Sequence, residues 1–309
     1  MNQKIACVTG ASGKIGKRIV DTLLSRNFHV RVLCFSKPNL TLGIECFTGG
    51  LHDKDVLQNF LKDATYLFHC AAELHNEKNM HAVNVVGTER LFEVVQESNL
   101  SYFCHMSSAG VIGTTKLKWV DEAASCHPDN EYERTKHQAE LVVNKKIKNC
   151  STVILRPINV MDDDFSGVFD LPIRNTLKDR LHVFIKGNEC AHQVHAGYIA
   201  KSAIHFMDKA FSKPEVFFVG NDEEEANTYK GIWNLVSQNS QSSTKSIKYS
   251  LPIWFPYLLR RLRGIKGNIA NVRYSSKKLL NSGCENEWNL KKTTDMLLQK
   301  SSEKSSSNL

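Results

Sequence analysis

Residues 5–16 read IACVTGASGKIG, and this stretch decides the fold. Its first five residues predict a buried strand, and the last three open a helix that we predict over Lys14–Ser25. The three glycines between and within these elements permit a tight turn, a close approach of the backbone to a phosphate, and close packing of helix on strand. Free N–H groups at such a helix start bind phosphates. The stretch therefore predicts a dinucleotide-binding turn, with contacts from Gly10, Ser12, Gly13, Lys14, Ile15 and Gly16.

The same alternation of strand and helix continues through the first 155 residues. It predicts further strands over Val30–Phe35, Tyr66–Cys70, Ser101–Met106 and Thr152–Leu155, and helices over Asp53–Leu61, Met80–Glu97 and Tyr132–Lys146. Such alternation implies parallel pairing with right-handed crossovers. Uninterrupted apolar strands fit a sheet that is covered on both faces. The predicted fold class is α/β, a Rossmann-type doubly wound parallel sheet with a smaller C-terminal substrate-binding domain.

The regular alternation of strand and helix patterns ends near Pro157, and this suggests how the chain divides into domains. We expect residues 1–160 to form the dinucleotide-binding domain, with segments near 190–220 returning to it. Residues 161–190 and 221–299 would form the substrate-binding part. The tail 300–309 is too polar to pack, and we predict that it is disordered.

The charge distribution excludes one class of protein. Lys and Arg number 40 against 32 Asp and Glu, a net charge of +8, and residues 241–309 alone carry 13 basic and 4 acidic residues. The rest of the chain is near neutral, which argues against a nucleic-acid binder. The sequence contains no run of 18 apolar residues, so we predict no membrane-spanning helix. The N-terminal residues match a strand pattern, so we expect no signal peptide. We therefore expect a cytoplasmic protein.

Cysteine and histidine spacing predicts no metal site. The nine cysteines stand singly, without a CxxC pair, and indicate reduced thiols. His192 and His195 are three residues apart, but no third ligand follows at a suitable spacing in the sequence.

Tyr132 and Lys136 form a YxxxK motif, which on a helix places both side chains on one face, one turn apart. A phenol has a pKa near 10 and is a poor base at neutral pH. We expect the neighbouring ammonium to lower that pKa. Tyr132 would then exchange a proton with a carbinol or carbonyl while hydride moves to or from a nicotinamide.

These motifs together resemble the extended branch of the short-chain dehydrogenase/reductase superfamily, the NAD-dependent epimerase/dehydratase family. The resemblance runs from about Lys4 to Leu298. It rests on the TGxxGxxG spacing of Thr9–Gly16, on YxxxK, and on the stretches HCAA at 69–72, NVVGT at 84–88 and RPINV at 156–160.

The resemblance implies a site. A serine ending a strand would hydrogen-bond the reacting oxygen, and alignment on Gly113 and on the gap to Tyr132 selects Ser108 rather than Ser107. Ser108, Tyr132 and Lys136 are then the catalytic residues. Implied cofactor contacts are Leu51, Ala71, Ala72, Asn84, Tyr132, Lys136, Pro157 and Ile158, and implied substrate contacts are Asn159 and Arg273.

The adenosine end departs from the family pattern. Cys34 stands where an acid would accept the ribose hydroxyls, and Ser36 and Lys37 follow it. Without a carboxylate to repel a 2′-phosphate, NADP becomes favourable there. The expected cofactor is NAD(P), leaning to NADP.

Three functions remain open. Ser108 is followed by Ala109 and Gly110 instead of the acid pair of the nucleotide-sugar dehydratases, which leaves oxidoreduction with or without epimerisation. The first reading is a 4-ketoreductase or 4-epimerase on a nucleotide- or lipid-linked sugar, acting as a homodimer. The second is a 3β-hydroxysteroid or dihydroflavonol-type dehydrogenase, whose serine motif resembles Ser107–Gly113 equally well. The third is a non-catalytic NAD(P)-sensing protein, against which the intact triad argues.

Residues 251–266 read LPIWFPYLLRRLRGIK, a basic amphipathic stretch. We interpret it first as an ordinary helix of the substrate-binding part. An arginine contact to a diphosphate and contact with an anionic membrane are the alternatives.

Overall fold

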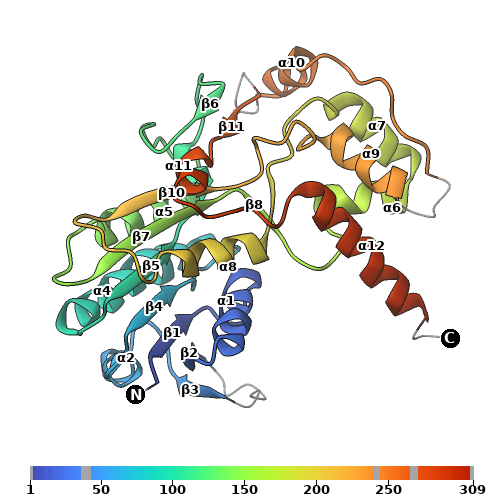
Figure 1. Ribbon diagram of the computed structural model, residues 1–309. Helices are drawn as coiled ribbons and strands as arrows, with labels where there is room; N and C mark the ends of the chain where they lie inside the picture. Colours follow the sequence, from blue (N-terminus) through green and yellow to red (C-terminus); the bar gives the residue numbers. More distant parts are fainter. Residues whose placement is uncertain (1–2, 36–42, 240–243, 265–270, 307–309) are drawn as a thin grey trace. The chain divides into compact units, whose positions relative to one another are not determined.

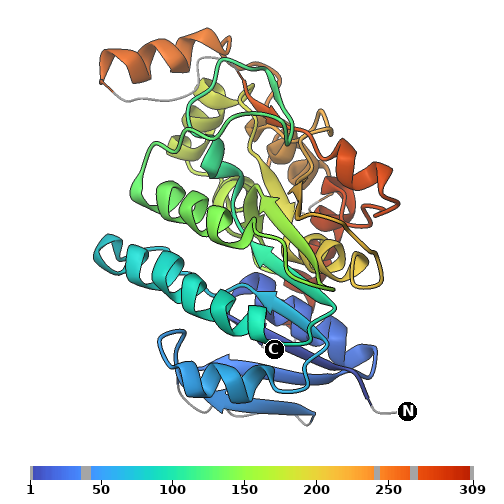
Figure 2. The same cartoon turned by 90° about the vertical axis from the view of Figure 1, so that its left-hand side faces the viewer.

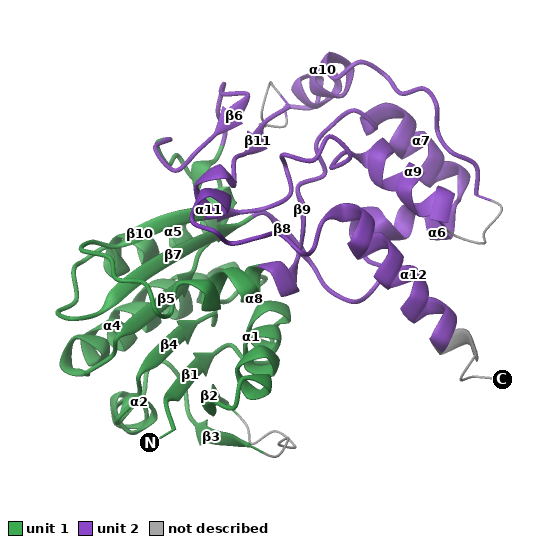
Figure 3. Cartoon of the chain, in the orientation of Figure 1, with its two compact units in different colours: residues 1–113, 125–157, 199–217 green, residues 114–124, 158–198, 218–309 purple. Residues whose placement is uncertain are grey.

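The computed structural model describes residues 3–35, 43–239, 244–264 and 271–306. The chain divides into two compact units (Figure 3). Unit 1 comprises residues 1–113, 125–157 and 199–217, and unit 2 comprises residues 114–124, 158–198 and 218–309. The sequence places 114–124 in the first domain, whereas the structure assigns them to unit 2.

Unit 1 is built on a seven-stranded sheet with the order β10-β7-β5-β4-β1-β2-β3 (Figure 1). Every pair from β7 through β3 is parallel. The strands are β1 (Ile5–Thr9), β2 (His29–Cys34), β3 (Ile44–Thr48), β4 (Tyr66–His69), β5 (Tyr102–Met106), β7 (Ser151–Pro157) and β10 (Glu215–Val219). This confirms the predicted α/β fold with a Rossmann-like parallel sheet. The edge strand β3 is an element that the sequence pattern did not predict.

Helices cover both faces of this sheet. They are α1 (Lys14–Ser25), α2 (Lys54–Leu61), α3 (Glu77–Met80), α4 (Gly87–Glu97), α5 (Glu131–Val143) and α8 (Ala196–His205). Helices α2, α4 and α5 pack side by side on one face, which is turned to the viewer in Figure 2, and share one apolar core with the strands. Figure 1 shows α1 and α8 on the other face.

The predicted helix over Met80–Glu97 is not a single α-helix. A π-helical segment, η1 (His81–Val86), separates α3 from α4. Helix α5 begins at an Asn130 N-cap, whose side-chain oxygen accepts a hydrogen bond from the Glu133 N–H at 2.9 Å. This cap fixes the start of the helix that carries Tyr132 and Lys136.

Unit 2 is mainly helical. Its helices are α6 (Leu171–Arg174), α7 (Leu177–Lys186), α9 (Tyr229–Asn239), α10 (Trp254–Leu262), α11 (Lys277–Asn281) and α12 (Leu290–Ser306), with the 3₁₀ turn η3 (Gly167–Asp170). Two short parallel pairs join β6 (Trp119–Val120) to β11 (Arg273–Tyr274), and β8 (Asn159–Met161) to β9 (Gln193–His195). Phe169, Val183, Trp233, Leu290 and Leu297 belong to its apolar core. Across the described ranges, no helix has both the length and the apolar composition needed to cross a bilayer.

The prediction of a disordered tail is wrong for most of its length. Helix α12 continues to Ser306, and only residues 307–309 lie outside the described part of the chain. Leu297 is buried in the unit 2 core, and the Lys300 ammonium pairs with the Asp163 carboxylate. These tertiary contacts hold a segment whose composition alone does not favour packing.

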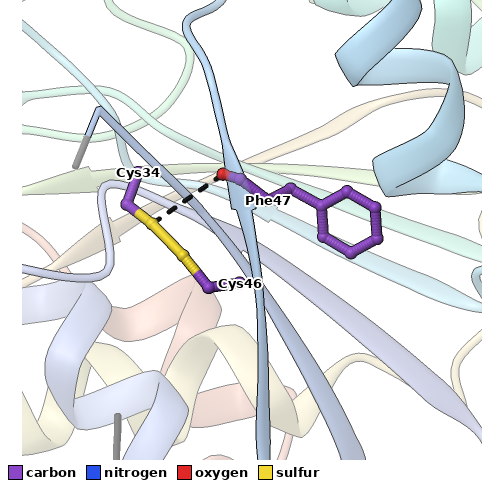
Figure 4. The surroundings of a disulfide bond; sticks show 3 residues. All are labelled: Cys34, Cys46 and Phe47. Carbon is purple, nitrogen blue, oxygen red and sulfur yellow. Dashed lines mark hydrogen bonds between the residues drawn. A yellow bond between two sulfur atoms is a disulfide. The ribbon is translucent and has the colours of Figure 1, made fainter. Parts of the chain in front are cut away.

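The prediction of nine reduced thiols is also wrong for two cysteines. Cys34 on β2 and Cys46 on β3 form a disulfide, whereas the other seven cysteines are free (Figure 4). In the strand register Cys46 lies opposite Val32, two residues before Cys34, so the two side chains share a face of the sheet. The pairing depends on β3, and no sequence spacing reveals it.

Candidate active site

The glycine-rich turn joins β1 to α1 and is shaped by contacts that exclude side chains. Gly10 has φ +69°, and a Cβ there would lie 2.5 Å from the Ala71 backbone nitrogen. At Gly16 a Cβ would lie 2.2 Å from the Gly10 carbonyl oxygen. Gly13 caps α1 in an extended conformation, without a side-chain hydrogen bond to the first turn of the helix. The turn thus presents backbone N–H groups at a helix start, with Ser12, Gly13 and Lys14 exposed.

The predicted site residues of unit 1 gather at one edge of the sheet. Strands β1, β4, β5 and β7 are consecutive neighbours and run in parallel, so their carboxyl ends meet there. The residues that follow these ends are, in that order, the glycine-rich turn, Ala71 with Ala72, Ser108, and the strand-ending Pro157. Ligands of doubly wound sheets bind at this edge.

A buried chain of hydrogen bonds through Thr9, His69 and Thr88 links the carboxyl ends of β1 and β4. The Thr88 hydroxyl donates to the Asn84 carbonyl at 2.6 Å, so the His69 Nε2–H must donate to the Thr88 oxygen at 3.0 Å. His69 Nδ1 then accepts from the Thr9 hydroxyl at 2.7 Å. Burial, with repulsion from Lys136, lowers the pKa of His69 to about 3, so this ring is neutral and serves as a structural link.

The two serines after β5 have different environments. Ser107 is buried and donates to Glu140, whose carboxylate also accepts from Arg156 at 2.7 and 2.9 Å. Ser108 is half-buried, its hydroxyl oxygen accepts from the Gly110 N–H at 3.1 Å, and it lies near enough to Tyr132 to lower the pKa of that phenol. The structure therefore brings Ser108, and not Ser107, together with the tyrosine.

The expected effect of Lys136 on Tyr132 is not what the structure shows. Burial raises the pKa of Tyr132, and the hydrogen bond from Ser108 opposes this rise without cancelling it. Lys136 is itself buried, its ammonium donates to the Met106 carbonyl, and burial lowers its pKa to about 8. The prediction of a lowered tyrosine pKa is wrong here, because desolvation of the phenolate dominates and repulsion from Glu133 adds to it.

Asn84 links η1 to α5, the helix that carries Tyr132 and Lys136. Its side-chain oxygen accepts from the Glu73 N–H at 2.7 Å, and its amide donates to the Glu73 carbonyl at 3.0 Å and the Thr135 hydroxyl at 3.1 Å. With its side chain buried and occupied in this way, Asn84 acts as a positioning residue between η1 and α5. The implied cofactor contact Leu51 is likewise buried, packed against Gly87.

Glu140 and Arg156 form a buried ion pair that no sequence motif predicts. Glu140 lies one turn after Lys136 on α5, and this spacing places both side chains on the buried face of that helix. No motif or composition singles out Glu140, because its hydrogen bonds depend on Arg156, which lies on the distant strand β7.

The remaining predicted residues are not part of the described unit 1. Ile158, Asn159 and Arg273 belong to unit 2, and Ser36 and Lys37 fall outside the described residues. Arg273 donates to the carbonyls of Asp222 and Glu224, and the Asn159 amide donates to the Ala191 carbonyl at 3.1 Å. Both side chains therefore hold backbone groups within unit 2.

Among the described residues, two clusters of metal-ligating residue types form in unit 2 that spacing along the sequence does not reveal. Cys190, His192 and Asp222 bring their ligand atoms within 4.8 Å of one another, as do Asp162, Asp163 and His195. The buried Asp222 carboxylate already accepts from His192, Asn227, Cys190 and the Tyr274 N–H. This saturation identifies a structural polar cluster.

A cavity of about 780 Å³ in unit 2 contains none of the predicted residues. Its lining includes Asp121, Glu122, Ser275, Lys277 and Lys278. Its size suits a small molecule, but the chemistry described above resides in unit 1.

The residues of unit 1 fit a dinucleotide. A Cβ at Gly10 or Gly16 would fill the turn, and the uncapped start of α1 has no acidic residue in its first turn to repel phosphates. The turn would hold the pyrophosphate. The next two strands of the sheet, β4 and β5, end near Ala71 and Ser108, on the side of the turn where Tyr132 and Lys136 are expected to meet the rest of the dinucleotide.

Comparison with known proteins agrees with this geometry. The model of the NAD-dependent epimerase/dehydratase family matches residues 6–220. A sterol-4-alpha-carboxylate 3-dehydrogenase (decarboxylating) from Mus musculus is 25% identical over 83% of this chain and 74% of its own length. A putative UDP-glucose 4-epimerase from Methanocaldococcus jannaschii is 26% identical over 70% of this chain and 77% of its own length.

Solved structures share the fold. A short-chain dehydrogenase/reductase superfamily protein from Agrobacterium tumefaciens with bound NAD superposes with a TM-score of 0.75 at 17% identity, covering 99% of this chain and 100% of the other. A UDP-glucose 4-epimerase from Thermotoga maritima with UDP-glucose gives a TM-score of 0.74 at 18% identity, covering 97% and 99%.

Proposed function

Because the chain belongs to the NAD-dependent epimerase/dehydratase family, we propose that it is an NAD(P)-dependent oxidoreductase that interconverts a secondary alcohol and its ketone. Ser108, Tyr132 and Lys136 are the proposed catalytic residues. The position of Ser108 beside Tyr132 carries this proposal, because the turn that begins at Ser108 packs against the helix that holds Tyr132 and Lys136 and so brings the three groups of the expected chemistry together.

The nicotinamide, when bound, supplies or accepts the hydride. Since burial raises the pKa of Tyr132, its phenol is protonated at neutral pH and is ready to donate a proton to a ketone oxygen. The Ser108 hydroxyl, which lies near the phenol, would hydrogen-bond the same oxygen. The ammonium of Lys136, one turn along α5, would stabilise the phenolate that remains.

Tyr132→Phe tests this assignment. The ring keeps its packing but loses the proton, so kcat should fall by about 10² or more while the dinucleotide Kd changes little. Ser107→Ala is the matched control, since Ser107 is bound to Glu140 and should retain activity if the protein folds. Full activity of purified Tyr132→Phe would contradict the proposed role.

Two substrate classes are candidates. A nucleotide- or lipid-linked sugar, reduced or epimerised at C4, is supported by the sequence likeness to a UDP-glucose 4-epimerase. The expected contacts Arg273 and Asn159, however, bind backbone carbonyls of unit 2.

For this reason we favour a hydroxysteroid-like alcohol or ketone over a sugar diphosphate. The sterol dehydrogenase from mouse and a sterol demethylase protein B from Methylococcus capsulatus, 27% identical over 58% of this chain and 59% of its own length, support this choice. Oxidation of NADPH and NADH should be followed with 3-ketosteroids and with UDP-4-ketosugars in parallel. Turnover of the steroids alone is the expected result. Turnover of only the sugars would reject the steroid class and leave the oxidoreductase assignment intact.

We further propose that NADP is preferred over NAD. Cys34 ends β2, where a carboxylate would repel a 2′-phosphate, and Lys14 is exposed in the phosphate turn. NADPH should therefore bind more tightly than NADH. Cys34→Asp should reverse the order, and Cys34→Ser, which also breaks the bond to Cys46 but adds no charge, should keep it. Tighter NADH binding to the unmodified protein, measured by calorimetry, would refute this preference.

A further inference from the structure

Helix α10 turns an apolar face to solvent. Trp254, Leu258 and Leu262 are 61%, 42% and 75% exposed, and their i, i+4, i+8 spacing places them on one side of the helix. The other side faces unit 2, where Pro256 is buried and Arg260 pairs with Glu189 at 3.0 Å. An amphipathic helix normally turns its apolar side toward the core, so this orientation is inverted.

Helix α7, which contacts α10 within unit 2, has the same inversion. Leu177, Leu181 and Phe184 are between 40% and 83% exposed at i, i+4, i+7 spacing, whereas Val183 on another side of the helix is buried. The Leu251 N–H donates to the Phe184 carbonyl at 2.8 Å and ties the segment before α10 to the end of α7. Two contacting helices thus expose six large apolar side chains, more than scattered surface residues would explain.

The exposed charged side chains next to these apolar residues on α10 and α7 are cationic. Residues 244–264 contain five cationic side chains and no Asp or Glu. Arg261 and Arg263 are exposed at the end of α10, and Lys245 and Lys248 are exposed just before it. On α7, the acid Asp179 is buried and paired with Arg174, whereas Lys178 and Arg180 are exposed.

We propose that this surface, formed by Trp254, Leu258, Leu262, Arg261 and Arg263 of α10 together with the exposed face of α7, binds an anionic lipid bilayer. The apolar side chains would enter the headgroup boundary, and the arginines would contact lipid phosphates. Trp254 and the exposed Tyr249 are residue types that favour this interface. The proposal does not depend on the substrate class.

A second copy of the chain fits this surface less well. In a two-fold dimer the same patch meets itself, so the cations of one copy would lie near those of the other without intervening acids. An anionic membrane instead supplies the complementary charge.

Sedimentation with vesicles tests the proposal. The full chain should bind vesicles of phosphatidylcholine mixed with phosphatidylglycerol, bind phosphatidylcholine alone weakly, and dissociate at high salt. Arg261→Gln with Arg263→Gln should weaken binding about twenty-five-fold, at about fivefold for each cation. The matched control is Lys291→Gln with Lys292→Gln, which removes the same charge from α12 and should change binding little.

The apolar contribution needs its own variant. Trp254→Ser with Leu258→Ser and Leu262→Ser should abolish sedimentation, and since all three side chains are exposed, cofactor binding and melting temperature should stay near those of the parent. Leu117→Ser with Leu141→Ser and Leu280→Ser removes three other exposed leucines as the control. Equal binding by both triple variants would overturn the proposal, as would a parent protein that stays in the supernatant. Conversion of a dimer to a monomer by the α10 variant, without vesicle binding by the parent, would identify a self-association surface instead.

Discussion

Gly10→Ala and Gly13→Ala separate the two tasks of the glycine-rich turn. At Gly10 an alanine would have to adopt φ +69°, at a cost of about 1–2 kcal/mol. Its Cβ would also meet the Ala71 backbone nitrogen at 2.5 Å, and such overpacking costs about 1–3 kcal/mol. A total of about 3 kcal/mol corresponds to a fall in Tm of about 6–12 °C.

Gly13 offers a different environment. Its φ is −76°, and a Cβ there would meet only the Gly10 carbonyl oxygen, at an ordinary contact distance of 3.4 Å. Gly13→Ala should therefore leave Tm unchanged or raise it slightly, since alanine restricts the unfolded chain. The methyl group would nevertheless stand where a pyrophosphate must approach the N–H groups of α1, so the dinucleotide Kd should rise at least about tenfold.

Differential scanning calorimetry and isothermal titration of both variants check this reasoning. The expected pattern is a low Tm for Gly10→Ala and a normal Tm with weak binding for Gly13→Ala. Equal melting temperatures would refute the steric account of Gly10. Unchanged affinity in Gly13→Ala would refute the placement of the phosphates.

Because burial lowers the pKa of Lys136 to about 8, its positive charge is lost as the pH rises through that value, and kcat/KM for ketone reduction should fall there. Lys136→Arg should remove this descending limb from the pH–rate profile, and an unchanged limb would assign it to another group. Glu140→Gln leaves Arg156 as a buried, poorly paired charge, so the free energy of unfolding measured with urea should fall by about 3–5 kcal/mol. The double variant Glu140→Leu with Arg156→Leu removes both charges and should lower it less. Thiol titration in denaturant should count seven cysteines before reduction and nine after it, and nine in both samples would show that Cys34 and Cys46 are not joined.

The parts of the site that were predictable depend on local spacing. The glycines of the turn lie within seven residues, and Tyr132 and Lys136 lie one helical turn apart, so chain geometry alone brings them together. The parallel sheet followed from the alternation of strands and helices. These features need no knowledge of what packs against them.

What escaped prediction depends on contacts between distant residues. The Cys34–Cys46 bond requires an edge strand whose sequence pattern is weak. The raised pKa of Tyr132 results from burial, which a motif does not report. The hydrogen bonds from Arg273 to the carbonyls of Asp222 and Glu224 likewise join residues about 50 positions apart, which no spacing in the sequence reveals.

The π-helical segment η1 has a consequence for how related chains are aligned. A π turn closes its hydrogen bonds over five residues instead of four, so it carries an additional residue relative to an α-helix. The inward positions of α3 and α4 are consequently out of phase with each other across His81–Val86. An alignment that treats residues 77–97 as one continuous α-helix will shift every inward position on one side of the segment by a residue. A gap placed inside His81–Val86 preserves both the core of α4 and the position of Asn84.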